Sequence, residues 1–187
     1  MINHIDLGSV LRGTVSERYT NLVTRPTGHA VRGAIEQILR SLDAQTVTVI
    51  DFSHVGLLDY SCADEIIAKL LQRFDARHHA DAPETAYFVF RGLNDAHLEA
   101  IEWVLQHHGL ALVAEPLDGE AHLLGDVNDD ERAVWQVARR LGVSALPVVA
   151  EHAGMETSRA EWALDQLHQR RLLLRDTDRI LSARPEA

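Results

Sequence analysis

The sequence predicts an α/β protein with a mixed sheet and helices, followed by a small, mainly helical segment. Short apolar runs rich in β-branched residues alternate along residues 1–125 with stretches whose apolar side chains recur at helical spacing. Residues 126–187 are mainly helical in pattern. Strands that alternate with helices favour crossover connections and a largely parallel sheet, with antiparallel additions at its edges.

Near the N-terminus the sequence predicts two short strands, at 4–11 and 19–25, joined by a polar turn. Pro26 ends the second strand, and Thr27 can cap the helix that follows. Apolar side chains at helical spacing over 31–42 indicate that helix.

The segment 46–66 is the most informative part of the chain. An apolar run ends abruptly in Asp51, which is typical of a buried strand whose carboxyl end reaches solvent. A short loop leads to Asp59 and Ser61, where helical spacing begins. Ser61 is expected to cap this helix, predicted over 61–77, and such a cap contributes about 1 kcal/mol. The three polar side chains should meet at the carboxyl edge of the sheet, where open α/β folds keep their sites.

Three further elements complete the predicted sheet region. A strand is expected at 86–90, and a helix at 95–108 ends before Gly109, a natural helix C-cap. The last two apolar runs, 110–115 and 121–125, are expected to form a β-hairpin.

After residue 125 the character of the sequence changes, so we place the boundary between two domains, 1–125 and 126–187, at a charged linker there. The second part is predicted to contain three helices and a tight hairpin, at 131–141, 144–153, 157–170, 172–175 and 179–182. This order is that of a winged helix, and residues 128–183 are similar in sequence to bacterial winged-helix regulators.

The segment around Asp59 resembles the core of the STAS domain (sulfate transporter and anti-sigma factor antagonist), and the resemblance covers residues 4–125. The signature of that family is an apolar strand ending in Asp, a short loop, and Asp-Ser-Ser-Gly at the start of a helix. Here the four positions are Asp59-Tyr60-Ser61-Cys62, so Tyr60 replaces the first serine and Cys62 the glycine. The sequence is closer still to STAS-like domains of unknown function in bacterial regulators.

In antagonists of the STAS family the second serine of the motif is a phosphorylated switch, and the resemblance implies this role for Ser61. It also implies a protein partner such as a kinase-like anti-sigma factor. A phosphate at a helix N-terminus is favoured by the helix dipole and adds nearly two negative charges to a docking surface. The residues alone favour a plain helix cap for Ser61, and the resemblance brings the two roles near parity.

A second set of polar residues lies at or just past the predicted carboxyl ends of strands: Arg25, Thr27, Asp51 and Arg91. The guanidinium of Arg25 and the backbone amides near Thr27 could hold a small anion or nucleotide. The alternative is a surface ion-pair network, which is the more common arrangement. No glycine-rich phosphate loop accompanies these residues.

The composition excludes several classes of function. The formal net charge of −10 repels phosphate backbones and membranes, so a nucleic-acid role requires a local basic patch. The chain has neither an apolar run of membrane-spanning length nor a signal-peptide pattern, so we expect a cytoplasmic protein without a membrane partner. Cys62 is the single cysteine and no spaced histidine set occurs, so we expect no metal and no cofactor. Catalytic motifs such as GxSxG are absent from the sequence, and we expect no enzymatic activity.

The predicted third helix of the C-terminal segment is the test for DNA binding. The arginines that could contact phosphates there are Arg159, Arg170, Arg171 and Arg175. From 155 to 187, however, six arginines face six acidic residues, whereas a DNA reader normally has a basic face. We expect DNA binding to be weak at most, and a role in protein contacts or homodimer formation fits this charge better.

The sequence therefore predicts a non-enzymatic bacterial signalling regulator that acts by protein–protein interaction, with Ser61, Asp59 and Asp51 at the docking site. Two alternatives stay open. One is a winged-helix transcription regulator whose α/β domain senses a ligand or a partner. The other is an enzyme that binds a small molecule at the rim formed by the strand ends.

Overall fold

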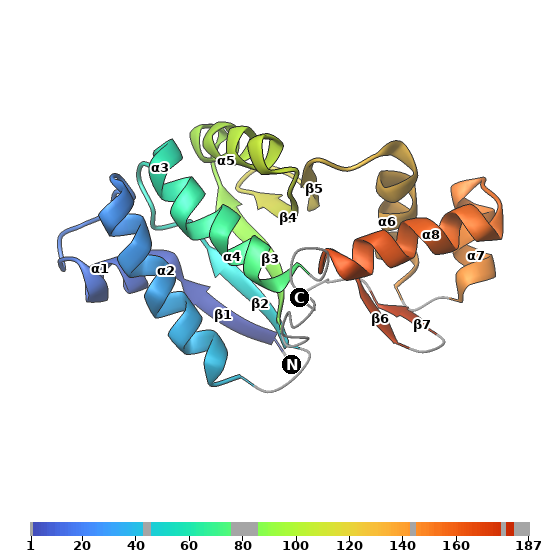
Figure 1. The fold of residues 1–187 in the computed structure, drawn as a ribbon, viewed down its shortest axis with the longest axis horizontal. Coiled ribbons are helices and arrows are strands. Elements are labelled where there is room, and N and C mark those ends of the chain that lie inside the picture. The colour runs from blue at the N-terminus through green and yellow to red at the C-terminus, as the bar shows by residue number, and fades with distance from the viewer. Residues whose placement is uncertain (1, 43–45, 76–85, 143–144, 177–178, 182–187) are drawn as a thin grey trace.

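A five-stranded sheet forms the centre of the computed structural model, which describes residues 2–42, 46–75, 86–142, 145–176 and 179–181 (Figure 1). Its strands lie side by side in chain order: β1 (Ile2–Asp6), β2 (Thr46–Asp51), β3 (Ala86–Leu93), β4 (Ala111–Pro116) and β5 (His122–Gly125). The first four strands are parallel, and β5 runs antiparallel to β4. The predicted α/β class, the mixed sheet and the terminal hairpin are thus confirmed.

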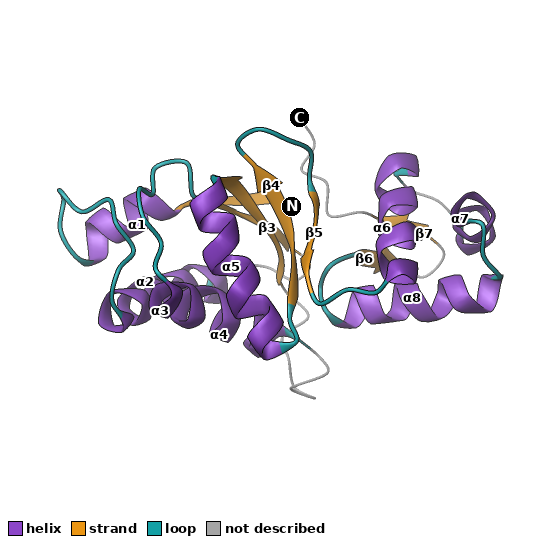
Figure 2. Ribbon diagram, turned by 90° about the horizontal axis from the view of Figure 1, so that it is seen from above, coloured by secondary structure: helices purple, strands orange, loops and turns teal. Residues whose placement is uncertain are grey.

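One face of the sheet is covered by the helices that connect its strands (Figure 2). These are α1 (Leu7–Thr14), α2 (Arg25–Arg40), a continuous helix made of α3 (Tyr60–Ala63), the π-helical segment η1 (Asp64–Ala68) and α4 (Lys69–Phe74), and α5 (Asp95–His108). The core between them and the sheet contains Ile50 and Phe90 from the strands and Ile66, Leu70 and Ile101 from the helices, all fully buried. Burial of this apolar surface is the main force that holds the layer together.

The opposite face of the sheet is covered by the C-terminal segment (Figure 2). This segment consists of α6 (Asp129–Leu141), α7 (Leu146–Ala153), α8 (Thr157–Gln169) and the hairpin of β6 (Leu174–Asp176) and β7 (Arg179–Leu181). Because successive strand residues point to opposite faces, Val49, Val89 and Val113 join this second core while their neighbours join the first. The side chains of α6 and α8 that meet them include Trp135 and Leu167.

Polar contacts fix the C-terminal segment to the sheet. The indole N–H of Trp135 donates to the backbone oxygen of Leu172 over 3.0 Å in a buried contact. The hydroxyl of Tyr87, on β3, lies 3.3 Å from Nδ1 of His168 on α8. The guanidinium of Arg171 lies over the same tyrosine ring, 5.7 Å from its centre. The two parts of the chain are therefore joined by one continuous interface.

Of the two predicted N-terminal strands, the first was predicted too long and the second is not formed. The strand ends at Asp6, whose carboxylate accepts a hydrogen bond from the backbone N–H of Gly8 over 3.0 Å and caps α1. Leu7 and Leu11 are buried whereas Ser9 between them is exposed, which fits helical spacing, because a strand would place all three residues on one face. In place of a strand over 19–25, which lies within the described residues, the structure has one isolated bridge from Leu22.

The central helix and the C-terminal hairpin agree with the prediction where the structure describes them. The helix predicted over 61–77 begins at Tyr60 and runs to Phe74, and residues 76–77 lie outside the described residues. The turn of the predicted hairpin, at 177–178, also lies outside them.

Candidate functional site

The carboxylate of Asp59, not the hydroxyl of Ser61, caps the central helix. Asp59 Oδ1 accepts the backbone N–H of Cys62 over 2.7 Å, as an N-cap side chain does. Ser61 lies in the first turn of the helix and donates its hydroxyl hydrogen to the same Oδ1 over 2.8 Å. The predicted cap is corrected here: Asp59, two residues earlier, satisfies the free amide, and the serine hydroxyl supports this cap.

Asp59 also joins the central helix to the segment that leads into α2. Its Oδ2 accepts the backbone N–H of Thr24 over 3.0 Å, and Cys62 donates its thiol hydrogen to the carbonyl of Thr24 over 3.0 Å. Thr24 has φ 75° and ψ 139°, a conformation that costs a β-branched residue of the order of 1–3 kcal/mol. The strained backbone is thus held in place by Asp59 and Cys62, which lie on either side of Ser61 in the chain.

The electrostatics of this site follow from these contacts. Burial opposes ionisation of Asp59, but the hydrogen bonds from the amides of Thr24 and Cys62 and from the Ser61 hydroxyl outweigh it, and the pKa of Asp59 is lowered. Burial, followed by the nearby charge of Asp59, raises the pKa of the Cys62 thiol to about 12. Cys62 is therefore protonated at neutral pH and serves as a buried hydrogen-bond donor rather than as a nucleophile.

Two exposed aromatic side chains lie beside Ser61. Tyr60, the neighbouring residue, is 47% exposed and meets Trp103 of α5 edge to face, with ring centres 5.3 Å apart. Trp103 is 54% exposed and stacks on His107 at 5.3 Å. We call Tyr60, Ser61, Trp103 and His107 the Ser61 surface. Exposed aromatic pairs of this kind are enriched at protein interfaces.

Arg25 belongs to an ion-pair network that links α2 to the π-helical segment. Its guanidinium donates to Asp64 Oδ2 over 2.7 Å and to Glu65 Oε1 over 2.9 Å. Lys69 and Arg32 also pair with the buried Glu65. Burial opposes the ionisation of Glu65, but the bonds from Lys69 and Arg25 outweigh it and lower its pKa. These contacts match the alternative prediction of an ion-pair network, with the guanidinium of Arg25 already engaged by carboxylates.

The rim residues of the strands also pair with one another. In the sheet register Asp51 lies opposite Arg91, and Arg91 opposite Glu115. Arg91 donates from Nε and Nη2 to the two carboxylate oxygens of Glu115 over 3.1 and 3.2 Å. Asp51 Oδ1 accepts the backbone N–H of Ser53 over 2.8 Å, and Gly92, with φ 71°, leaves space for this turn. Arg91 and Asp51 are thus brought together, whereas Arg25 pairs with acids on a different element.

Thr27, the other member of the predicted anion rim, lies in the first turn of α2. Its hydroxyl is 3.2 Å from the hydroxyl of Thr24. It therefore adds to the contacts around the strained residue instead of facing Arg91 or Asp51 as part of one ligand site.

The predicted DNA-contacting arginines are engaged within the C-terminal segment. Arg159 makes a bidentate pair with Asp130, with its Nη2 2.7 and 2.8 Å from the two oxygens. Arg170 is buried and pairs with Glu131 over 3.1 Å, and Arg171 is buried against Tyr87. The side chain of Arg175 lies outside the described residues. DNA phosphates would have to displace acidic partners from Arg159 and Arg170.

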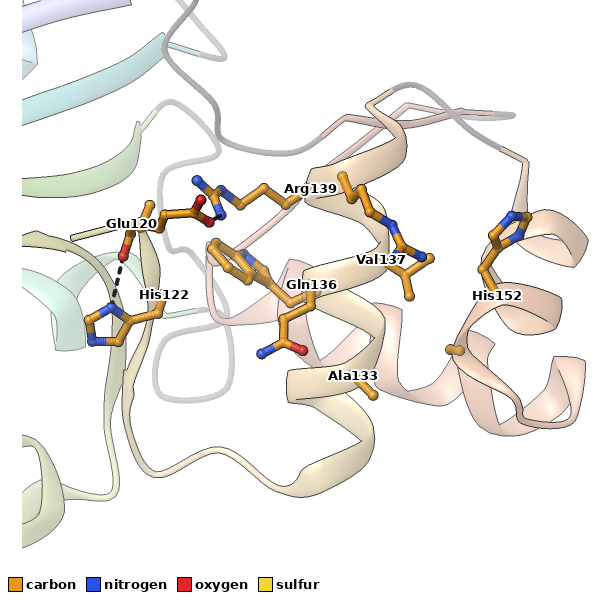
Figure 3. Close-up of a pocket in the computed structure, with 11 residues that line it drawn as sticks. Glu120, His122, Ala133, Gln136, Val137, Arg139 and His152 are labelled. Carbon is orange, nitrogen blue, oxygen red and sulfur yellow. Dashed lines mark hydrogen bonds and ion pairs between the residues drawn. The ribbon is translucent and has the colours of Figure 1, made fainter.

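A groove that the sequence analysis did not find lies between β5, α6 and α7 (Figure 3). Its volume is about 820 Å³, and the exposed face of α6 lies between two walls. Glu120 and His122 stand on one side, His152 on the other, and Arg139 reaches toward Glu120 (Figure 3). No motif marks this groove, since its residues come from three separate elements. The adjacent arginines at the end of α6 are the single signal that points to it.

Among the described residues, no group of three or more His, Cys, Asp or Glu side chains is arranged to hold a metal ion. Within the same parts of the chain, no helix combines the length and the apolar character needed to span a bilayer. Neither observation singles out a further site.

The comparisons with known proteins leave the site to be judged on its geometry. No family model, no curated protein and no solved structure matched the chain.

Proposed function

We propose that the protein is a non-enzymatic signalling regulator that binds a partner protein at the Ser61 surface. The observation that carries this proposal is the exposed pair of Tyr60 and Trp103 beside a serine hydroxyl that is bonded to the helix cap. Aromatic side chains supply much of the energy at protein interfaces. The resemblance of Asp59-Tyr60-Ser61-Cys62 to the STAS motif supports the same assignment, with a kinase-like anti-sigma factor as the partner and the cytoplasm as its location.

Phosphorylation of Ser61 is the switch in this proposal. A kinase would transfer the γ-phosphoryl group of ATP to Oγ, releasing ADP and the hydroxyl proton. The new phosphate lacks the hydrogen that Ser61 now donates to Asp59, and it places nearly two negative charges beside that carboxylate. Repulsion would weaken both the cap and the hold of Asp59 on Thr24. The docking surface would thus change in charge and in shape.

The finer fold assignment is part of this proposal. Residues 1–125 form a STAS-like unit and residues 126–187 a winged-helix-like unit. The order of three helices and a hairpin in the second unit supports it. The paired arginines of that unit favour a role in protein contacts over DNA binding.

Binding measurements with a kinase-like anti-sigma factor from the same organism would test the proposal. Ser61→Asp should weaken the complex at least tenfold through repulsion and desolvation at the contact, whereas Ser61→Ala should leave it intact. Trp103→Ala should also weaken the complex at least tenfold. Trp162→Ala is the matched control, because Trp162 is 53% exposed but lies on α8. Equal binding by wild type, Ser61→Asp and Trp103→Ala would refute the proposal, and tight binding to duplex DNA would favour the transcription regulator instead.

A further inference from the structure

The groove between β5, α6 and α7, called the α6 groove below, carries positive charge on an acidic protein. Arg139 and Arg140 line it together with two histidines, and its single carboxylate is Glu120. The whole chain has a formal net charge of −10. A concentration of cationic groups in one hollow of such a chain attracts anions locally.

The two arginines are available to a ligand in different ways. Arg139 pairs with Glu120 over 3.2 Å, but the Glu120 side chain is 89% exposed, so this pair is weak and easily exchanged. The guanidinium of Arg139 also lies over the ring of Trp135, 5.8 Å from its centre, and this contact helps to hold it in place. Arg140 is exposed and has no partner among the residues that the structure describes.

The floor of the groove is apolar. Ala133 and Val137 occupy the middle of α6, and Ala121 and Ala153 line the two walls. Gln136 adds one neutral polar group on the same side of the helix (Figure 3). A volume of about 820 Å³ with an apolar floor and a few polar groups is typical of a site for a small organic molecule.

We propose that the α6 groove binds a small amphipathic anion, with an apolar body on Ala133 and Val137 and a carboxylate, sulfonate or phosphate on Arg139 and Arg140. This inference does not depend on the proposed role of Ser61. The helices α6 and α7 of the groove lie across the sheet from α3 and α5, which carry the Ser61 surface (Figure 2). Its walls come from β5 and its approach loop on one side and from α7 on the other, so a bound ligand holds the C-terminal helices against the sheet.

Anilinonaphthalene sulfonate is a suitable probe, because it combines a planar apolar body with one anionic group and fluoresces when bound. Titration of the full chain, followed by fluorescence and calorimetry, should show one site. The neutral analogue N-phenylnaphthylamine should bind at least tenfold more weakly. Saturating probe should raise the midpoint of thermal unfolding, since it binds the native state only.

Two variants test separately the positive charge of the α6 groove and the space above its apolar floor. Arg140→Gln should weaken probe binding at least fivefold without loss of a fold contact, and Ala133→Leu should block the floor while leaving every charge in place. Arg18→Gln is the matched control, since Arg18 is exposed and lies outside the groove. Its binding should equal that of wild type. The inference fails if the neutral analogue binds equally well, if both groove variants bind like wild type, or if inorganic phosphate alone displaces the probe at similar concentrations.

Discussion

The carboxylate of Asp59 accepts three hydrogen bonds near Ser61. It accepts hydrogen bonds from the amides of Thr24 and Cys62 and from the hydroxyl of Ser61, so it closes a helix end and holds a strained backbone. Because one side chain makes all these contacts, we expect the stability of the protein to be sensitive to its mutation. It also explains how a change at Ser61 could be transmitted to the segment before α2.

Replacing Asp59 should therefore destabilise the protein more than replacing Ser61. Asp59→Ala removes the cap, which costs about 0.5–2 kcal/mol, and also removes the hydrogen bond that Asp59 accepts from the amide of Thr24. Ser61→Ala removes one hydrogen bond, which is worth about 0.5–1.5 kcal/mol. Urea unfolding of both variants measures the difference. A larger loss for Ser61→Ala would mean that the serine, not the aspartate, closes the helix.

His97 should make stability depend on pH below neutrality. The ring is buried beside Phe52, its Nε2 lies 3.1 Å from the backbone oxygen of Gly56, and burial lowers its pKa. The unfolded chain binds a proton below about pH 6.5, whereas the native ring resists it. Stability is therefore complete above this pH and falls as the pH drops through it, by up to about 1.4 kcal/mol per pH unit.

The change His97→Gln should remove this part of the pH dependence, because an amide can donate to the Gly56 oxygen without titrating. His107→Gln is the control, since His107 is exposed on the same helix and should leave the slope in place. Urea unfolding at several pH values between 5 and 8 gives the slopes. Identical slopes for wild type and His97→Gln would contradict the assignment.

At the scale of single residues, the sequence predicted which residues lie at the start of the central helix, but not which of them caps it. Asp59, Ser61 and Cys62 follow from the position of a strand end and a helix start, and both elements are where the pattern places them. Which of Asp59 and Ser61 caps the helix could not be predicted, because both are good caps and the two choices move the start of the helix by only two residues. The strain at Thr24 has no sequence signal at all.

At the scale of elements, the packing of α2 against the central helix depends on a close approach at Gly28. A Cβ atom there would lie 2.9 Å from Cβ of Glu65 and 3.1 Å from Cα of Cys62. The ion pairs from Arg25 and Arg32 to Glu65 cross the same contact. Gly28 thus sets the distance at which the buried charge of Glu65 meets its partners.

Gly28→Ala should therefore destabilise the protein by about 1–3 kcal/mol, since the added methyl group forces two packed helices apart. Gly33→Ala is a matched control on the same helix, where a Cβ would meet nothing within 4 Å. That change should instead stabilise the protein by about 0.5–1 kcal/mol through helix propensity. Thermal and urea unfolding of the two variants should give shifts of opposite sign. Equal shifts would show that α2 can move away at little cost.

The elements themselves were predicted with uneven success. The central strands and the helices after them were found because long apolar runs and helical spacing leave little ambiguity. The first strand was extended too far because residues 4–11 contain both patterns, and the cap at Asp6 decides between them. The π-helical segment around Glu65 has no distinctive pattern, since it inserts a widened turn into an otherwise ordinary helix.

For the whole molecule, the decisive feature is that the second face of the sheet is covered by the C-terminal helices. Val49, Val89, Val113 and Leu123 are buried in the core that these helices complete. The sequence indicated a linker at 126–130 and led us to expect an independently folded unit before it. Strand alternation indicates two buried faces, but it does not say which distant segment covers the second one.

A fragment of residues 1–125 should consequently expose a hydrophobic sheet face. We expect it to bind anilinonaphthalene sulfonate at several sites, to self-associate and to melt at a lower temperature than the full chain. Replacement of Val49, Val89 and Val113 by threonine in the fragment should reduce the self-association. Analytical ultracentrifugation and thermal melts measure both effects. A monomeric fragment that melts like the full chain would mean that the C-terminal helices add little to the stability of the sheet.

The helices that cover the second face of the sheet are synthesised after all five strands, and this order has a consequence for biosynthesis. A chain emerging from the ribosome completes its five strands with residue 125, but the side chains that shield the second face extend to Leu173. At about 5–20 residues per second, translation of that stretch takes roughly 2–10 s. During this interval a nascent chain would present bare valines next to its neighbours on a polysome. Folding in the cell is therefore expected to depend on chaperones that shield nascent chains, and synonymous changes that slow translation after residue 125 should lower the yield of native protein.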